Sequence, residues 1–283
     1  MHYFIYNPIA GNFGPKKRLA LIEFIRANPN NIILETKNKN EECELTQKAI
    51  ALGAEKIIAV GGDGTINKVA SILVKTDIPL GIIPMGSGNG LARHLGISMN
   101  PQKALNTATH GKTIQIDACT LGEKLFFCTA GIGFDAAVAE IFDKRKKRGL
   151  LNYILAIFIA IKNFKPIDIE IEEGKKETLF LLTIANANQY GNNAYISPFA
   201  DIQDGNFEII KIKKSNPFFL LTLGIRLFLK NIHKSRNVDI LTANNICIDC
   251  PSNQPLHLDG ESHITKEEKL KVSILPNALN VIV

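Results

Sequence analysis

Ile57-Ile58-Ala59-Val60-Gly61-Gly62-Asp63-Gly64-Thr65 is an apolar run that ends in a glycine-rich loop. A second run, Leu80-Gly81-Ile82-Ile83-Pro84, is followed by the loop Gly86-Ser87-Gly88-Asn89-Gly90. Glycine lets the backbone adopt positive φ and lets amide groups approach an anion with no Cβ in the way. A helix that follows such a loop adds unpaired N–H groups and the positive end of its dipole. Two such loops in one sheet, with an aspartate in the first, predict a nucleotide phosphate site.

Strand and helix patterns alternate through the first hundred residues. This alternation predicts a parallel sheet that is covered on both faces. Ligands bind such sheets outside the carboxyl ends of the strands, so we expect the loops at 7–11, 61–65 and 86–90 to converge on one ligand. The predicted strands are 2–6, 32–36, 57–60 and 80–84, and the predicted helices are one opened by Pro15, 41–52, 66–74, 91–95 and one opened by Asn100-Pro101.

The pattern changes near residue 119 to short apolar runs separated by turn clusters, which predicts a mostly antiparallel sandwich. The expected fold class is therefore a Rossmann-like or phosphofructokinase-like α/β nucleotide domain plus a C-terminal antiparallel β-sandwich, with a cleft between them. The expected boundaries are 1–118 and 119–275, with the tail 276–283 open to either domain. The predicted strands are 125–130, 167–173, 178–187, 206–213, 245–250 and 270–275, and the predicted helices are 149–164 and 217–232.

Composition and charge exclude several classes of protein. Hydrophobic residues make up 46% and charged residues 21% of the chain, proportions typical of a folded globular protein. The net charge of +6 suits an anionic partner without requiring one, and nothing indicates nucleic acid. The N-terminus lacks a secretory signal pattern and no apolar run approaches the roughly 20 residues that cross a bilayer. We therefore expect a cytoplasmic protein.

Cysteine and histidine chemistry is not expected to carry the function. The chain has five scattered cysteines, an odd number that argues against a disulfide framework. Cys247 and Cys250 have C-x-x-C spacing, but they fall in a strand-like stretch and not at the helix start that activates a thiol. The six histidines show no zinc-binding spacing.

The ordered set of motifs resembles the diacylglycerol kinase catalytic-domain family, which includes sphingosine and ceramide kinases and bacterial lipid kinases. The Gly-Gly-Asp-Gly motif alone is shared with NAD kinases and phosphofructokinases, whereas the combination is specific and covers nearly the whole chain. The matching positions are Asn7-Pro8 with Gly11, residues 61–65 and 86–95, Ile116-Asp117, Ser197-Pro198, Asp204-Gly205 and Asp259-Gly260-Glu261.

The resemblance implies ATP and Mg²⁺ as cofactors. It assigns Asp117 to a magnesium–water network, and Asp201, Asp204 and Asn206 to a separate structural magnesium site, with a carboxylate from Asp204 and carbonyls from the other two. Magnesium prefers oxygen ligands and keeps several waters. The positions implied to surround ATP are Asn7, Pro8, Gly11, Thr36, Gly61, Gly62, Asp63, Gly64, Thr65, Asn67, Gly86, Ser87 and Asn89.

The resemblance also implies a lipid kinase that transfers the γ-phosphoryl group of ATP to the hydroxyl of a diacylglycerol or sphingoid lipid. Glu261 is implied as general base, with Asp63 as the alternative. Gly90 replaces an aspartate of many bacterial diacylglycerol kinases, and Gln203 replaces another beside Asp204. These departures bear on the magnesium network and on diacylglycerol as the substrate. Two alternatives stay open: an NAD kinase-like enzyme with a soluble substrate, and a catalytically weak lipid-binding sensor.

A lipid substrate has to be collected from a membrane surface. The basic run 144–148 leads directly into the apolar run 149–159, a pattern typical of an interfacial helix on anionic lipid. A helix packed on the sandwich, preceded by a solvated basic turn, explains the same residues. The helix 217–232 is equally ambiguous because it contains Arg226 and Lys230. The sequence leaves a homodimer open.

Overall fold

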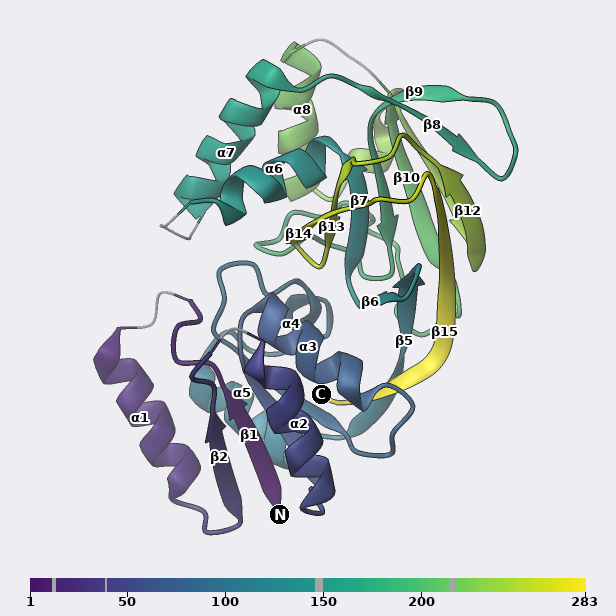
Figure 1. Cartoon of the computed structure of the whole chain (residues 1–283). Coiled ribbons are helices and arrows are strands. Elements are labelled where there is room, and N and C mark those ends of the chain that lie inside the picture. Colours follow the sequence, from purple (N-terminus) through teal and green to yellow (C-terminus); the bar gives the residue numbers. More distant parts are fainter. Residues whose placement is uncertain (12–13, 39, 146–149, 214–216) are drawn as a thin grey trace. The chain divides into compact units, whose positions relative to one another are not determined.

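A computed structural model describes residues 1–11, 14–38, 40–145, 150–213 and 217–283. The chain forms two compact units, Met1–Ile116 with Asn277–Val283, and Asp117–Pro276. Two strands, β5 (Thr113–Leu121) and β15 (Lys269–Ile282), both labelled in Figure 1, contribute residues to both units.

The first unit contains the parallel sheet that the sequence predicts. Its strands run in the order β2-β1-β3-β4 and pair in parallel throughout. The end of β15 joins the sheet through Val281, which pairs in parallel with Leu80. Ile57, Ile58 and Val60 of the central strand are fully buried, as expected for a strand covered on both faces. The strands are β1 (His2–Tyr6), β2 (Asn31–Glu35), β3 (Lys56–Gly61) and β4 (Leu80–Pro84).

Two pairs of helices cover this sheet: α1 packs with α5, and α2 packs with α3. The side chain of Asn100 accepts hydrogen bonds from the amides of Gln102 and Lys103, which confirms the predicted cap of α5. The helix after the first glycine loop begins at Asp63 and not at the predicted Ile66, because the extended Gly62 is its N-cap. The bounds are α1 (Pro15–Arg26), α2 (Glu41–Ala51), α3 (Asp63–Leu73), α4 (Gly90–His94) and α5 (Pro101–His110).

The second unit is an antiparallel sandwich, as predicted. One sheet joins β14, β13, β7, β9, β10 and β11 in that order. Strand β8 connects β9 of this sheet with β12, which pairs with β15. The bounds are β6 (Lys124–Phe126), β7 (Thr129–Gly133), β8 (Ile167–Ile171), β9 (Glu177–Ala185), β10 (Phe207–Lys213), β11 (Val238–Ala243), β12 (Asn245–Asp249), β13 (Pro255–Leu258) and β14 (Glu261–Ile264).

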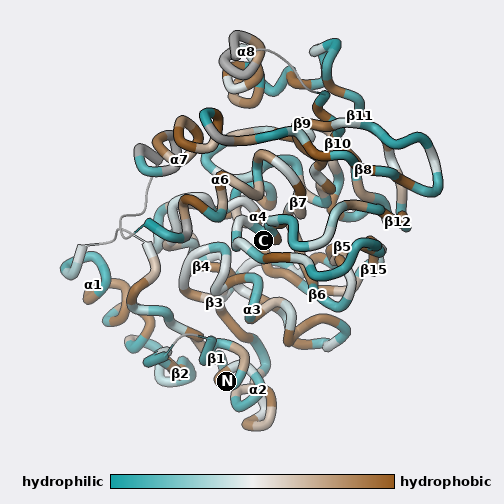
Figure 2. Tube along the Cα trace, turned by 45° about the horizontal axis from the view of Figure 1, so that its top comes forward, coloured by the Kyte–Doolittle hydropathy of each residue, from teal (hydrophilic) through white to brown (hydrophobic). Residues whose placement is uncertain are grey.

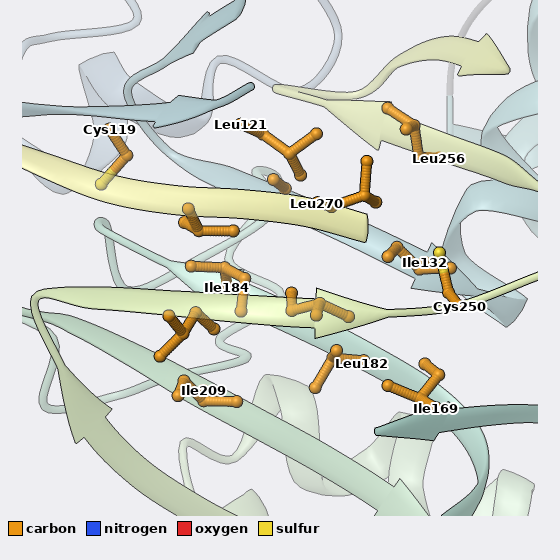
Figure 3. Packing of buried hydrophobic residues seen from close by; sticks show 14 of the residues in the cluster. Cys119, Leu121, Ile132, Ile169, Leu182, Ile184, Ile209, Cys250, Leu256 and Leu270 are labelled. Atoms are coloured by element: carbon orange, nitrogen blue, oxygen red, sulfur yellow. The ribbon is translucent and has the colours of Figure 1, made fainter. Parts of the chain in front are cut away.

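Alternating side chains of these strands form the core of the sandwich (Figure 3). Ile132 from β7, Ile184 from β9 and Leu256 from β13 point to the same face and pack against Leu270 of β15. Each such side chain contributes about 1.5–3 kcal/mol relative to its exposed state. The opposite face of β7 and β9 is therefore available to the helices of this unit.

Three helices belong to the second unit: α6 (Phe134–Asp143), α7 (Leu150–Asn163) and α8 (Pro217–Phe228). Helix α6 was not predicted from the sequence. The predicted strand 125–130 is wrong, because β6 ends at Phe126 and β7 starts at Thr129. The predicted helix 217–232 ends at Phe228 and is followed by a short 3₁₀ turn at Ile232–Lys234. Residues 146–149, with most of the predicted basic run and the start of the helix 149–164, lie outside the described residues.

Candidate functional site

Three loops meet at the carboxyl edge of the first sheet, as the sequence predicts. A Cβ on Gly11 would lie 1.5 Å from the carbonyl oxygen of Met85, which joins the loop after β1 to the loop after β4. A Cβ on Gly86 would lie 2.8 Å from the Cα of Gly62, so the two glycine-rich loops touch at their glycines. Only glycine permits this spacing, and the resulting cluster of backbone amides is suited to an anion.

Asp63 of the first glycine-rich loop is hydrogen-bonded to the backbone of the second. Its two carboxylate oxygens accept hydrogen bonds from the amides of Asn89, at 2.8 Å, and Gly90, at 2.7 Å. Gly90 thus contributes a backbone donor. These contacts show Asp63 holding the two loops in place.

Asn89 organises its own loop. It adopts a left-handed conformation with φ of 54°, and its side chain exchanges two hydrogen bonds with the backbone of Gly86, at 2.8 and 2.9 Å. With only 4% of its surface exposed, Asn89 shapes the loop from inside. Ser87 is half-buried in the same loop.

A buried carboxylate that the sequence analysis did not single out lies beneath the loop after β1. Glu42 of α2 accepts a hydrogen bond from the Asn7 amide at 3.1 Å, and its Oε1 lies 3.4 Å from the Thr65 hydroxyl. Asn7 also donates to Thr65 at 3.1 Å, and Lys68 lies 3.8 Å from the other carboxylate oxygen. Glu42 therefore joins β1 to α3, and no local motif marks it because its partners come from other elements.

The remaining predicted nucleotide positions lie along the same edge of the sheet. Thr36 is buried directly after β2, where its amide donates to the Tyr6 carbonyl. Pro8 follows β1, and Asn67 lies in the second turn of α3. The first unit thus brings together Asn7, Pro8, Gly11, Thr36, Gly61, Gly62, Asp63, Gly64, Thr65, Gly86, Ser87 and Asn89 at the ends of its strands.

In the second unit, Asp117 binds the turn that contains Asp204. The Asp117 carboxylate is completely buried and accepts the amide of Gly205 at 2.8 Å. The Asp204 carboxylate accepts the amide of Asn206, and the Asp201 carboxylate accepts that of Gln203. The residues of the two predicted magnesium positions are therefore close together in the fold.

Oxygen donors of this kind fit magnesium. Within the described ranges, however, no group of three or more His, Cys, Asp or Glu side chains is arranged to hold a metal. A cation at this turn would therefore depend on backbone carbonyls and water as well as on Asp204, which is compatible with the coordination that magnesium prefers.

The Asp259-Gly260-Glu261 turn is fastened to the start of β7. The Asp259 carboxylate accepts three amides, those of Phe127, Cys128 and Thr129, at 2.8–3.1 Å. Asp259 and Gly260 both have positive φ, as a two-residue hairpin turn with this twist requires. Asp259 thus has a structural role, and Glu261 is the first residue of β14 after the turn.

Asn186, which the sequence analysis did not identify, connects these two clusters. Its side-chain amide donates to the carbonyls of Asp117, at 3.1 Å, and Phe127, at 2.9 Å, while none of its surface is exposed. The amide of Phe127 in turn donates to the Asp259 carboxylate at 2.9 Å. Asp117 and the hairpin of Glu261 therefore belong to one connected site.

The chain matches two family models. Residues 2–121 match the diacylglycerol kinase catalytic domain, and residues 128–283 match the YegS C-terminal NAD kinase beta sandwich-like domain. A diacylglycerol kinase of Mycobacterium tuberculosis is 30% identical over 84% of this chain and 80% of its own length. A diacylglycerol kinase of Bacillus subtilis is 29% identical over 91% and 88%. A crystal structure of a putative diacylglycerol kinase from Bacillus anthracis has a TM-score of 0.78 at 22% identity and covers 99% and 94% of the two chains, so it supports the fold.

Proposed function

Because the chain belongs to the diacylglycerol kinase family of lipid kinases, we propose that it transfers the γ-phosphoryl group of ATP to the hydroxyl of a membrane lipid such as a diacylglycerol or a sphingoid lipid. The three loops of the first unit bind the nucleotide phosphates, and Glu261 of the second unit accepts the proton of the lipid hydroxyl. The observation that carries the proposal is the contact between the two glycine-rich loops, made by Asp63 and by Gly62 with Gly86.

The nucleotide half of the proposal follows from the positions of backbone donors. Phosphoryl transfer depends mainly on positioning and on electrostatic stabilisation of a charged phosphoryl group. The N-terminus of α3 follows Gly62 directly and adds its first-turn amides and the positive end of the helix dipole. Gly11, Gly62 and Gly86 allow the three loops to approach one another at this edge of the sheet, because a Cβ at each position would meet the backbone of a neighbouring loop.

Magnesium would be held through Asp117 and through the turn of Asp201, Asp204 and Asn206. When bound, the cation would offset negative charge on the phosphate oxygens or stabilise the turn. Asp117 orients this turn through the Gly205 amide. Gln203 is exposed and its amide donates to Asp201, so it shapes the turn through its backbone.

Glu261 is the proposed general base because the resemblance to the diacylglycerol kinase family implies that role for the glutamate of the Asp259-Gly260-Glu261 turn. Asp63 holds the second loop, and Asp259 holds the start of β7. A positioned carboxylate that accepts the hydroxyl proton contributes a factor of roughly 10² to 10⁴ to the rate.

The experiment that tests the proposed function is a transfer assay with radiolabelled ATP and Mg²⁺. Mixed micelles of diacylglycerol, ceramide, sphingosine or a polyprenol serve as acceptors, and NAD serves as a soluble acceptor. We expect one lipid to be labelled and NAD to remain unlabelled. Labelling of NAD would show that the protein phosphorylates a soluble substrate instead of a lipid. ATP binding without transfer to any acceptor would favour the lipid-binding sensor.

A further inference from the structure

Two polar side chains flank a glycine on the face of the second unit's sheet that lies opposite the core of Figure 3. His257 of β13, Gly131 of β7 and Thr183 of β9 are direct cross-strand neighbours. Asp135, in the first turn of α6, reaches over Gly131 and contacts both flanking residues. Its Oδ2 lies 2.7 Å from the Thr183 hydroxyl and 3.1 Å from Nε2 of His257.

Gly131 provides the space in which this contact forms. A Cβ at this position would lie 2.1 Å from Oδ2 of Asp135 and 2.5 Å from Nε2 of His257. Tyr190 completes the cluster, because its hydroxyl donates to the same carboxylate oxygen at 3.2 Å. The two glycines of β7 thus have different roles. Gly133 has positive φ, whereas the lack of a side chain at Gly131 leaves space for the contact between Asp135 and His257.

The cluster is deeply buried. Thr183 is 0%, His257 1% and Asp135 8% exposed. A buried carboxylate is costly unless hydrogen bonds compensate for the lost water, and three side chains supply them here. Among the described residues, Nδ1 of His257 has no hydrogen-bond partner, so the imidazole is oriented by its contact with Asp135.

The cluster lies next to the hairpin of Glu261. His257 pairs with Ser262, and the following pair, Leu258 with Glu261, closes the hairpin. Helix α6, which carries Asp135, packs against both β13 and β14. The Asp259 carboxylate binds the turn to the Phe127 amide just before β7, and Asp135 contacts both Thr183 of β9 and His257 of β13, two residues before Asp259. The hairpin is therefore held at two places.

We propose that Asp135, with Thr183, Tyr190 and His257, is a positioning residue that fixes the hairpin and thereby orients Glu261 toward the acceptor hydroxyl. This inference rests on the proposed function of Glu261. The cluster acts through the backbone of β13 and is not itself part of the reaction. Loosening it should lower kcat without changing the nucleotide loops of the first unit.

The test uses three variants of one strand. Thr183→Val removes one donor to Asp135 with nearly the same shape, and Thr183→Ser retains the hydroxyl. Thr178→Val is the matched control, because Thr178 also lies in β9 and donates at 2.7 Å to a carboxylate, that of the exposed Asp168. All three are studied in the full-length protein, with thermal unfolding as a check of folding.

Two readouts distinguish positioning from general stability. We expect Thr183→Val to lower kcat for lipid phosphorylation about tenfold or more, since small misplacements of reacting groups are costly, with KM for ATP unchanged. We expect faster amide hydrogen exchange at 127–129 and 258–261, with no change in the first unit. Thr183→Ser should restore both values, and Thr178→Val should affect neither. Should Thr183→Val unfold, Tyr190→Phe takes its place.

The inference is overturned if Thr183→Val leaves kcat and the exchange of the hairpin unchanged, or if Thr178→Val produces the same effects. A failure of the proposed function looks different: the wild-type protein would label no lipid at all. In that case the exchange measurement still decides whether the Asp135 cluster holds the hairpin.

Discussion

Gly11 and Gly53 both have a left-handed backbone, with φ of 68° and 77°, yet their surroundings differ. A Cβ on Gly53 would meet no atom within 4 Å, whereas a Cβ on Gly11 would overlap the Met85 carbonyl. We expect Gly53→Ala to cost only the conformational strain of about 1–2 kcal/mol. Gly11→Ala should in addition separate the loops after β1 and β4 and weaken ATP binding at least tenfold.

The measurement is ATP binding by isothermal titration, with the free energy of unfolding of both variants determined in parallel. Equal ATP affinity in the two variants would contradict the convergence of these loops on the nucleotide.

Glu208 is a carboxyl whose titration should affect stability. Burial, with a smaller contribution from Asp204, raises its pKa above the ordinary value, and the Ser197 hydroxyl donates to it. Between the ordinary and the raised pKa the folded state binds more protons than the unfolded state, so the free energy of unfolding falls as pH rises through this window. Glu208→Gln should remove that decrease.

Thermal unfolding of Glu208→Gln and of the wild-type protein, from about pH 4 upward, tests this expectation. The variant should gain stability relative to the wild type as pH rises. Parallel pH profiles would show that Glu208 does not titrate as its burial implies.

At the scale of elements, the two cysteines with C-x-x-C spacing have structural roles: Cys247 lies in β12 and Cys250 directly follows this strand. Burial raises the pKa of Cys250 to about 11, with added contributions from Asp249 and Glu268, and Cys250 packs in the sandwich core (Figure 3). Cys247 is only half-buried. The thiolate is the reactive form of cysteine, so alkylation near neutral pH should modify Cys247 well before Cys250.

Mass spectrometry after a short iodoacetamide pulse measures the two rates. Equal labelling, or a Cys247–Cys250 disulfide under mild oxidation, would contradict the structural interpretation of this motif.

Local signals explain which elements could be predicted. Asn100-Pro101, the glycine loops and the buried run 57–60 act through residues close in sequence, and the structure contains the cap, the loops and the strand that they predict. Helix α6 was missed because it follows β7 directly at Gly133, with no polar cap to mark its start. Glu42 and Asn186 were missed because their partners are 23 to 69 residues away, so only the folded chain shows their roles.

Helix α7 presents apolar side chains in two directions. Ala156 and Ala160 are buried against α6, while Phe158 is 66% exposed, and Figure 2 shows hydrophobic stretches along the helix. Among the described residues, no helix is long and apolar enough to span a bilayer. We expect Phe158→Ser to weaken binding to anionic vesicles about tenfold or more, because the variant would lose the apolar contact of an exposed aromatic ring with the lipid.

Vesicle co-sedimentation measures this effect, and Phe24→Ser in α1 is the matched control, because Phe24 is also exposed, at 53%. Identical losses in both variants would assign the binding to general hydrophobicity and not to α7.

At the scale of the whole molecule, we propose a separate task for each unit: the first would bind ATP through three loops, and the second would supply the base. Phosphoryl transfer needs both, so binding and turnover should separate on mutation. Variants of the first unit should change KM for ATP, whereas variants of the hairpin should change kcat. The family relationship establishes a lipid kinase, and the assignment of these tasks is what experiments have to test.

The most direct measurement is the rate of phosphate transfer from ATP to the lipid that the acceptor panel identifies, for the wild-type protein and for Glu261→Gln, with ATP affinity measured on both. We expect kcat of Glu261→Gln to fall by roughly 10² to 10⁴ while its ATP affinity stays the same. A Glu261→Gln variant that transfers phosphate at the wild-type rate would contradict the proposed mechanism.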